Sequence, residues 1–216
     1  QSDGGLIMAF ISNGTTILDA GSFASGTVNA DQILIKTITA SSDSTIDFVN
    51  GSSSVVFDGT YPTYVFKFIN IHPATYQARF SFQVDTGTNT SYNQPVTSTW
   101  YYAYHKEDGN DGSAAYYQDG DLAQSSSFKN ITWNVDNGND DNVCGELHMF
   151  SPSSTEFVKH WISDTNFNYG VSGDAIERVY CSGYFNTTTA LTRVRFKFTS
   201  GNIDSGLIKL YGIKDS

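Results

Sequence analysis

The stretch HKEDGNDGSAAYYQDGD, residues 105–121, carries side chains that could bind a cation. It contains five carboxylates: Glu107, Asp108, Asp111, Asp119 and Asp121. Carboxylate oxygens are preferred ligands of calcium. An EF-hand loop starting at Asp108 would need glycine at its sixth position and glutamate at its twelfth, where this chain has Ser113 and Asp119. The EF-hand template therefore fails, but a calcium site built from scattered oxygens does not require it.

Two interpretations of these acids stay open. In the first, Asp108, Asp111, Asp119 and Asp121 hold calcium, and a second acidic turn, DNGNDD at residues 136–141, lies close by. In the second, which we favour, both stretches are solvated turns of the kind that Gly, Asn and Asp form. No organic cofactor is expected, so calcium is the candidate ion.

The same stretch contains adjacent tyrosines, Tyr116 and Tyr117. Tyrosine offers a large contact area at low entropic cost, and its hydroxyl bonds polar partners, so the pair is our candidate ligand contact. In the structural alternative, one tyrosine enters the core and the other covers a sheet edge. If both contact a ligand, replacing both with alanine should weaken binding and leave folding intact.

Three further residues could meet across a hairpin centred on the turn SPSS. In that register Glu146 faces His160, and His148 lies on the same face. A glutamate with two histidines could bind a metal. A cross-strand hydrogen-bonded pair on a wetted face is the favoured alternative, because a slip of one residue moves every side chain to the other face.

Catalytic signatures are absent from the sequence. It has no G-x-S-x-G, no H-E-x-x-H, no Gly-rich phosphate loop and no dinucleotide fingerprint. A pair of glycosidase carboxylates on a β-scaffold would escape motif analysis, since only their separation in space defines them. We therefore expect a protein without catalytic activity.

In the segments that must position these residues, apolar and polar side chains alternate with a period of two, as they do in β-strands. Nine segments show it: ILIKTIT, STIDFVN, TYVFKFINI, ARFSFQV, TWYYAYH, GELHMF, EFVKHWIS, LTRVRFKFT and SGLIKLYGI. Turn signals such as VNGSS, DTGTN and TSGN separate them. The pattern predicts an all-β protein, a single antiparallel β-sandwich that is jelly-roll-like, over residues 31–216. Residues 1–30 are expected to form an N-terminal arm or edge segment.

The charge and hydropathy of the chain limit the classes of partner that it is expected to bind. The net charge of -10 and the pI near 4.6 disfavour a phosphate backbone. The densest basic group, Arg193, Arg195 and Lys197, alternates with apolar residues and is interpreted as one strand's solvent face. No apolar run approaches the ~18 residues of a membrane span. Neither nucleic acid nor membrane is expected as a partner.

Cys144 and Cys181 are expected as buried thiols, with a disulfide as the alternative.

Three long stretches carry a resemblance: VVFDGTYPTYVFKFINIHPAT, FSPSSTEFVKHWIS and GYFNTTTALTRVRFKFTSGNIDSGLIKLYGI. They resemble a family of small all-β proteins of tailed marine bacteriophages and marine viral metagenomes. The resemblance covers most of residues 31–214, and MAFISNGTTILDAG is similar to a family start. Residues 1–7 have no counterpart. The family consists of uncharacterised or virion structural proteins, so the resemblance implies a viral origin and brings no catalytic residues.

The leading expectation is a virion structural protein with a surface-contact role, either tail-fibre-type and receptor- or glycan-contacting, or head-decorating. Other virion proteins and a host-surface glycan are the expected partners. Because a sandwich must protect its edge strands, we also expect a closed homo-oligomer, by analogy a trimer. The alternative is a secreted carbohydrate-binding module with Trp100, Trp133, Trp161 or the tyrosines as platforms. A planar row of exposed aromatics would favour that module, and buried tryptophans would disfavour it.

Overall fold

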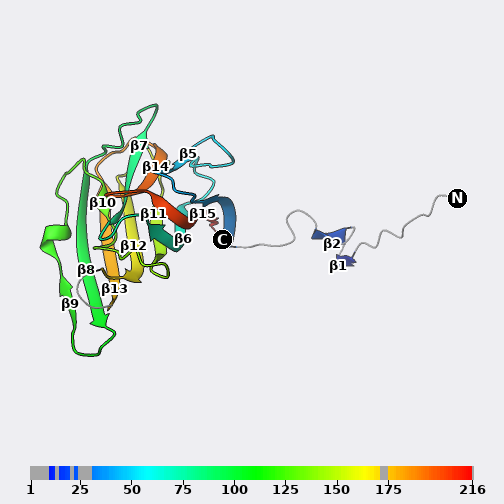
Figure 1. Cartoon of the computed structure of the whole chain (residues 1–216). Helices are drawn as coiled ribbons and strands as arrows, with labels where there is room; N and C mark the ends of the chain where they lie inside the picture. The colour runs from blue at the N-terminus through cyan, green and yellow to red at the C-terminus, as the bar shows by residue number, and fades with distance from the viewer. Residues whose placement is uncertain (1–9, 13–14, 20–21, 24–30, 171–174, 216) are drawn as a thin grey trace. The chain divides into compact units, whose positions relative to one another are not determined.

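The computed structural model describes residues 10–12, 15–19, 22–23, 31–170 and 175–215 (Figure 1). The chain divides into two compact units, Gln1–Asp31 and Gln32–Ser216. In the first unit the described residues form a small antiparallel sheet of β1 (Phe10–Ser12), β2 (Thr15–Asp19) and β3 (Ser22–Phe23). The second unit holds every candidate residue discussed below.

The second unit is a sandwich of two antiparallel sheets. The larger sheet has eight strands, in spatial order β4 (Gln32–Thr39), β15 (Ile203–Ile213), β6 (Thr63–Pro73), β11 (Val143–Phe150), β12 (Lys159–Asn168), β13 (Ala175–Phe185), β8 (Val96–Lys106) and β9 (Gly112–Tyr116). The smaller has four strands, in the order β10 (Lys129–Asn130), β7 (Phe80–Thr86), β14 (Leu191–Phe198) and β5 (Ile46–Val49). The predicted all-β antiparallel sandwich is confirmed.

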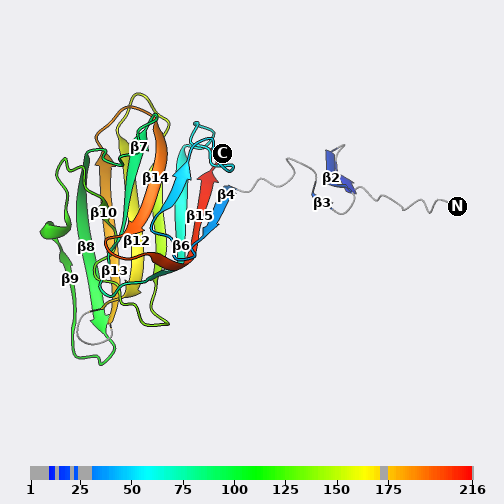
Figure 2. The ribbon, with the colours of Figure 1, turned by 45° about the horizontal axis from the view of Figure 1, so that its top comes forward.

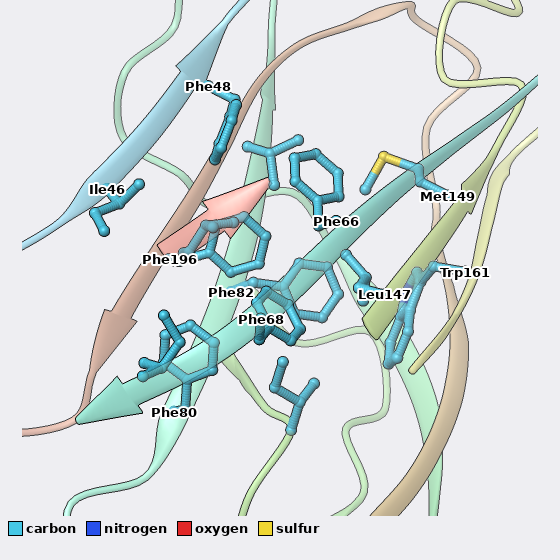
Figure 3. Packing of buried hydrophobic residues seen from close by; sticks show 14 of the residues in the cluster. Ile46, Phe48, Phe66, Phe68, Phe80, Phe82, Leu147, Met149, Trp161 and Phe196 are labelled. Atoms are coloured by element: carbon cyan, nitrogen blue, oxygen red, sulfur yellow. The ribbon is translucent and has the colours of Figure 1, made fainter. Parts of the chain in front are cut away.

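The core between the sheets is built largely from phenylalanine (Figure 3). Phe196 on β14 lies 5.2 Å from Phe66 on β6, centroid to centroid, and Phe82 on β7 lies 5.0 Å from Trp161 on β12. Both contacts are edge-to-face, the arrangement that aromatic quadrupoles favour. Each such ring contributes roughly 2 kcal/mol by leaving water. The alternating Phe positions of the sequence therefore form the interior, as their period of two requires.

Two strands of the larger sheet were not among the nine expected segments. In β13 the inward positions include Glu177, while the outward positions include Ile176 and Tyr180. The other inward residues, Ala175, Val179, Cys181 and Phe185, are apolar, so both faces of β13 carry apolar side chains and the alternation does not resemble that of a half-buried strand. β9 consists mostly of Gly, Ser and Ala and gives no hydrophobic signal. β8 and β9 lie at one edge of the sandwich and β4 at the other (Figure 2).

The smaller sheet does not cover the whole inner face of the larger one. Beyond β10, residues 131–142, here called the cover segment, pack over β8, β12 and β13. Trp133 of this segment lies 6.2 Å from Trp100 on β8. The carbonyl oxygen of Ile131 accepts a hydrogen bond from the Thr165 hydroxyl on β12, and the Phe80 N–H donates to Thr132 at 2.7 Å. Part of the second layer is thus irregular chain.

In the described part of the chain, the single turn of 3-10 helix η1 (Gln118–Gly120) is the only helical segment. Accordingly, nothing helical in that part is long and apolar enough to cross a membrane.

Candidate functional site

The acidic stretch 105–121 spans the β8–β9 hairpin and the helical turn after it. Within the hairpin turn, Asp108 accepts the Asn110 N–H at 2.9 Å, and this backbone hydrogen bond lowers the pKa of Asp108. Asp111 forms an ion pair with Lys106 at 3.2 Å. These two carboxylates, half of the proposed calcium set, are therefore engaged with neighbours in their own hairpin.

The other two carboxylates of the set lie beyond the far end of β9. Asp119 is in η1, and Asp121, which follows it, accepts a hydrogen bond from the Tyr116 hydroxyl. β9 separates this pair from Asp108 and Asp111. Among the described residues, no three His, Cys, Asp or Glu side chains form a group that could hold a metal ion.

The two acidic stretches do meet in space. Glu107 of the hairpin and Asp136, Asp140 and Asp141 of the DNGNDD turn line one hollow of about 180 Å³. Asp141 accepts the Gly138 N–H at 2.9 Å, so its carboxylate also organises the turn. The hollow concentrates negative charge at this end of the sandwich.

Tyr116 and Tyr117 point to opposite faces of the sheet, because consecutive residues of extended chain do so. Tyr117 faces inward and packs edge-to-face on Trp133 at 5.0 Å and on Trp100 at 6.0 Å. Tyr116 faces outward, and 51% of its surface is exposed. The expected pair is thus divided between the interior and the outer face.

On the outer face Tyr116 joins two other tyrosines in one cross-strand row. It is the register partner of Tyr101 on β8, which is in turn the partner of Tyr180 on β13. Tyr101 is 54% exposed and Tyr180 42% exposed. The rings of Tyr101 and Tyr116 lie 5.3 Å apart. We call Tyr116, Tyr101 and Tyr180 the tyrosine row.

Polar side chains continue this row across the sheet. Asp164 on β12 is the partner of Tyr180, and Glu146 on β11 is the partner of Asp164. Arg178 binds Asp164 through two hydrogen bonds of 2.9 and 2.6 Å and lies 4.5 Å from the centre of the Tyr180 ring. Tyr101, Tyr180, Asp164 and Glu146 are among the residues that line an open hollow of about 360 Å³. Aromatic surface and hydrogen-bonding groups therefore lie side by side.

The expected register of the β11–β12 hairpin is wrong. Glu146 is paired with Asp164 and not with His160, because the loop joining the strands is longer than the SPSS turn. Glu146 contacts His148 on its own strand at 2.8 Å, while His160 packs on Tyr184 at 5.7 Å. The three residues thus do not form the proposed metal triad.

The two cysteines are free thiols, of which Cys181 is buried as expected, whereas Cys144 is only partly buried. Cys144 lies on β11 and Cys181 on β13, with β12 between them, so they do not face each other across a strand pair. Burial raises the pKa of Cys181 to about 12. That thiol is therefore protonated and unreactive at neutral pH.

The basic group on β14 is largely engaged by partners within the molecule. Arg195 binds Asp47 through two hydrogen bonds of 2.7 and 2.6 Å and lies 3.9 Å from the centre of the Tyr92 ring. Lys197 lies 4.4 Å from the Phe128 ring centre. This group is not an open basic stripe.

An aromatic pocket opens where the cover segment meets the larger sheet. Its cavity is about 160 Å³, and its lining residues are Trp100, Tyr102, Tyr104, Tyr117, Trp133, Tyr169 and Glu177. β8 contributes the first three, whose side chains alternate onto the inner face. The others come from four separate places in the chain, so no local sequence pattern predicts the pocket.

Glu177 is the one carboxylate among the described lining residues, and only 4% of its surface is exposed. Burial raises its pKa from 4.5 to about 7. Sequence reasoning missed this residue. The available signal was an acid at an inward position of the alternating segment AIERVYC.

Searches against protein-family models, curated proteins and solved structures found no match to this chain. The resemblance to phage proteins therefore stays an expectation from the sequence. The case for a binding role depends on the tyrosine row and the aromatic pocket.

Proposed function

We propose that this chain is a bacteriophage virion structural protein that contacts a host-surface glycan and has no catalytic activity. The observation that carries the contact role is the tyrosine row: three exposed tyrosines in register on neighbouring strands of one rigid sheet. The phage origin is supported by the resemblance of three long stretches of sequence. Tail-fibre-type and head-decorating positions are both compatible with this contact role.

The tyrosine row has the chemistry that sugars require. A pyranose ring has an apolar C–H face that can lie on an aromatic ring, and hydroxyls around its edge. Tyr101 and Tyr180 supply the rings, and their two phenol groups can also form hydrogen bonds. Asp164 and Glu146, farther along the same row, supply carboxylate oxygens as acceptors. An oligosaccharide lying along the row would meet rings first and acceptors next.

The negative charge of the chain determines which class of glycan the tyrosine row can bind. The chain has a net charge of -10, and the row leads into Glu146 and into Asp164, whose charge is offset by Arg178. Anionic polysaccharides would be repelled at low ionic strength. We therefore propose a neutral or amine-bearing glycan as the ligand.

A binding role is also favoured over glycoside hydrolysis at the aromatic pocket. Glycosidases pair two carboxylates across the scissile bond. Of the described residues that line this pocket, Glu177 alone is acidic.

The test is binding of the fluorescently labelled chain to marine bacterial cells, with calcium and with a chelator. The double variant Tyr101→Ala/Tyr180→Ala should bind at least about tenfold more weakly, because exposed aromatic anchors dominate such contacts. Tyr76→Ala is the matched control: Tyr76 is 50% exposed but lies outside the row. Loss of binding on chelation would indicate that calcium at the acidic stretches takes part.

Unchanged binding by the double variant, with Tyr76→Ala also unchanged, would refute the row as the contact surface. Failure of the folded wild-type chain to bind any strain would shift the proposal toward head decoration.

The tyrosine row also favours a second candidate, a secreted carbohydrate-binding module. Burial of Trp100 and Trp161, each 1% exposed, excludes those two as surface platforms. Immunogold labelling of purified phage particles with an antibody against the chain separates the candidates. Label on particles supports the virion role; glycan binding with unlabelled particles supports the secreted module.

A further inference from the structure

Glu177 is a buried carboxylate without a compensating charge. Its neighbours on the inner face are Tyr104 on β8, Phe167 on β12, and Ala175 and Val179 on its own strand. None of them is a cation. The described residues give its carboxylate no hydrogen bond or ion pair, and burial is the sole cause of its raised pKa. An isolated carboxylate in such surroundings is costly unless it is protonated or a ligand supplies the opposite charge.

The surroundings of this carboxylate attract cations. Six aromatic side chains line the pocket with Glu177, and the faces of aromatic rings carry partial negative charge. The chain itself uses this property nearby. The Arg79 guanidinium lies 3.6 Å from the centre of the Trp133 ring, and the Lys129 ammonium lies 4.8 Å from that of Trp100. Neither Arg79 nor Lys129 lines the pocket, so both leave Glu177 uncompensated.

We propose that the aromatic pocket binds a methylated ammonium group, with Glu177 as its counter-ion and the tyrosine and tryptophan rings as its cage. This site is separate from the tyrosine row, which lies on the opposite face of the sheet. The inference therefore goes beyond the proposed glycan contact and does not depend on it.

A methylated ammonium uses the aromatic rings of this pocket more fully than a primary one. A primary ammonium carries three N–H donors and would take its acceptors from Glu177 and from the four tyrosine hydroxyls of the lining. A quaternary ammonium has no donors and is bound by ring faces and charge alone. The cavity of about 160 Å³ is close to the ~150 Å³ that accommodates benzene in an engineered cavity, so a trimethylammonium group fits.

The groups facing Glu177 give the site a defined pH dependence. Burial raises the pKa values of Tyr104 and Tyr169, so both hydroxyls are neutral in the range where Glu177 titrates. The hollow containing Glu107 and Asp136 shares Tyr169 with the pocket and adds negative potential. A cation should bind the ionised form of Glu177. Affinity therefore rises with pH through about 7 and then levels off.

The test titrates the full chain with choline and with dimethylbutanol, the uncharged carbon isostere of choline, and follows the fluorescence of Trp100 and Trp133. Choline should bind saturably, at least about tenfold more tightly than the isostere, at about pH 8.5. Its affinity should fall at about pH 5.5. Glu177→Gln should remove the part of this preference that rises with pH and leave only the part due to the ring faces, whereas Glu146→Gln, on the outer face, should retain all of it.

Equal affinity for the two compounds would mean that the cavity is merely apolar, and the inference would be wrong. Absence of saturable choline binding would also overturn it. If Glu177→Gln fails to fold, the pH dependence of wild-type binding decides: choline affinity that does not change between the two pH values contradicts a role for Glu177. None of these outcomes bears on the Tyr101→Ala/Tyr180→Ala experiment, so the two proposals stand or fall separately.

Discussion

Glu177 shows at the scale of a single residue how a candidate binding site can cost stability. Its carboxylate is buried among Phe167, Val179 and tyrosine rings. A raised pKa in the folded chain means that the folded state holds its proton more tightly than the unfolded state. The contribution of Glu177 to the free energy of unfolding is therefore fully present below its ordinary pKa of 4.5 and is lost as the pH rises through about 7.

We predict that the free energy of unfolding of the Glu177→Gln variant lacks this decrease with rising pH. A rise of the Glu177 pKa from 4.5 to about 7 corresponds to about 3 kcal/mol of unfolding free energy. The wild type loses this free energy as the pH rises through the same interval. Above about pH 7 the variant should thus be the more stable protein. Urea denaturation at a series of pH values measures the difference between the two chains. Parallel stability curves would mean that Glu177 is better solvated than its 4% exposure implies.

Tyr116 and Tyr117 show why residue type alone does not locate a site. The two are chemically identical neighbours in sequence, and two interpretations of them were open: a joint ligand contact, or one tyrosine in the core and the other at a sheet edge. One instead packs on Trp133, and the other joins the tyrosine row. Their separation follows from the strand period once β9 is known, but β9 itself has no hydrophobic pattern to reveal it.

At the scale of elements, Gly145 on β11 allows two strands to approach closely. Its φ is +149°, and a Cβ atom added there would lie 2.2 Å from the carbonyl oxygen of Asp164 on β12. That oxygen is backbone and cannot rotate away. Any larger residue at 145 must push apart the strands that carry Glu146 and Asp164.

Gly145→Ala should therefore lower the unfolding free energy by at least about 2 kcal/mol. Gly87→Ala is the matched control. Gly87 also has a positive φ, +55°, but open space surrounds its missing Cβ. This control should lose only about 1 kcal/mol, from backbone strain alone. Chemical denaturation of both variants gives the comparison, and equal losses would show that the close approach is relieved by a small strand shift.

The strands that could be predicted are those whose two faces differ in polarity. β6, β7 and β14 place phenylalanines toward the core and mostly polar side chains on the opposite face, so the period of two can be recognised in their sequences. On β7 the polar side chains of Ser81, Gln83 and Asp85 are themselves buried. β13 turns an acid inward and tyrosine outward because it contributes to both candidate binding surfaces. The strand carrying the most functional information was thus the one that the hydrophobic pattern concealed.

At the scale of the whole molecule, the larger sheet ends in two edge strands, each with one side that no other described strand of the sandwich pairs with. β4 and β9 end the larger sheet, and on β4 the side chain of Leu34 is 51% exposed. An exposed edge with an apolar side chain favours pairing with another copy. This supports the proposed closed homo-oligomer, a trimer by analogy with fibre and decoration proteins.

Light scattering coupled to size exclusion should therefore give the mass of three chains of 23.7 kDa. Leu34→Lys should shift the population toward monomer, because a charge on an edge strand opposes edge pairing. Tyr76→Ala again serves as a control for loss of an exposed apolar group. A wild-type chain that is monomeric at high concentration would refute the oligomer.

The unequal widths of the two sheets have a kinetic consequence. Where β7 and β14 face β6, regular hydrogen-bonded strands lie on both sides of the core. Over the aromatic pocket, one of the two layers is the cover segment, which lacks regular strands but is anchored by backbone hydrogen bonds at Ile131, Asn134, Val135 and Asp136. Ile131, Thr132 and Val135 are fully buried, so this segment is part of the folded core. Because the pocket is already open beside this anchored segment, a bound molecule can enter and leave without local unfolding, and its exchange should be fast compared with unfolding of the sandwich.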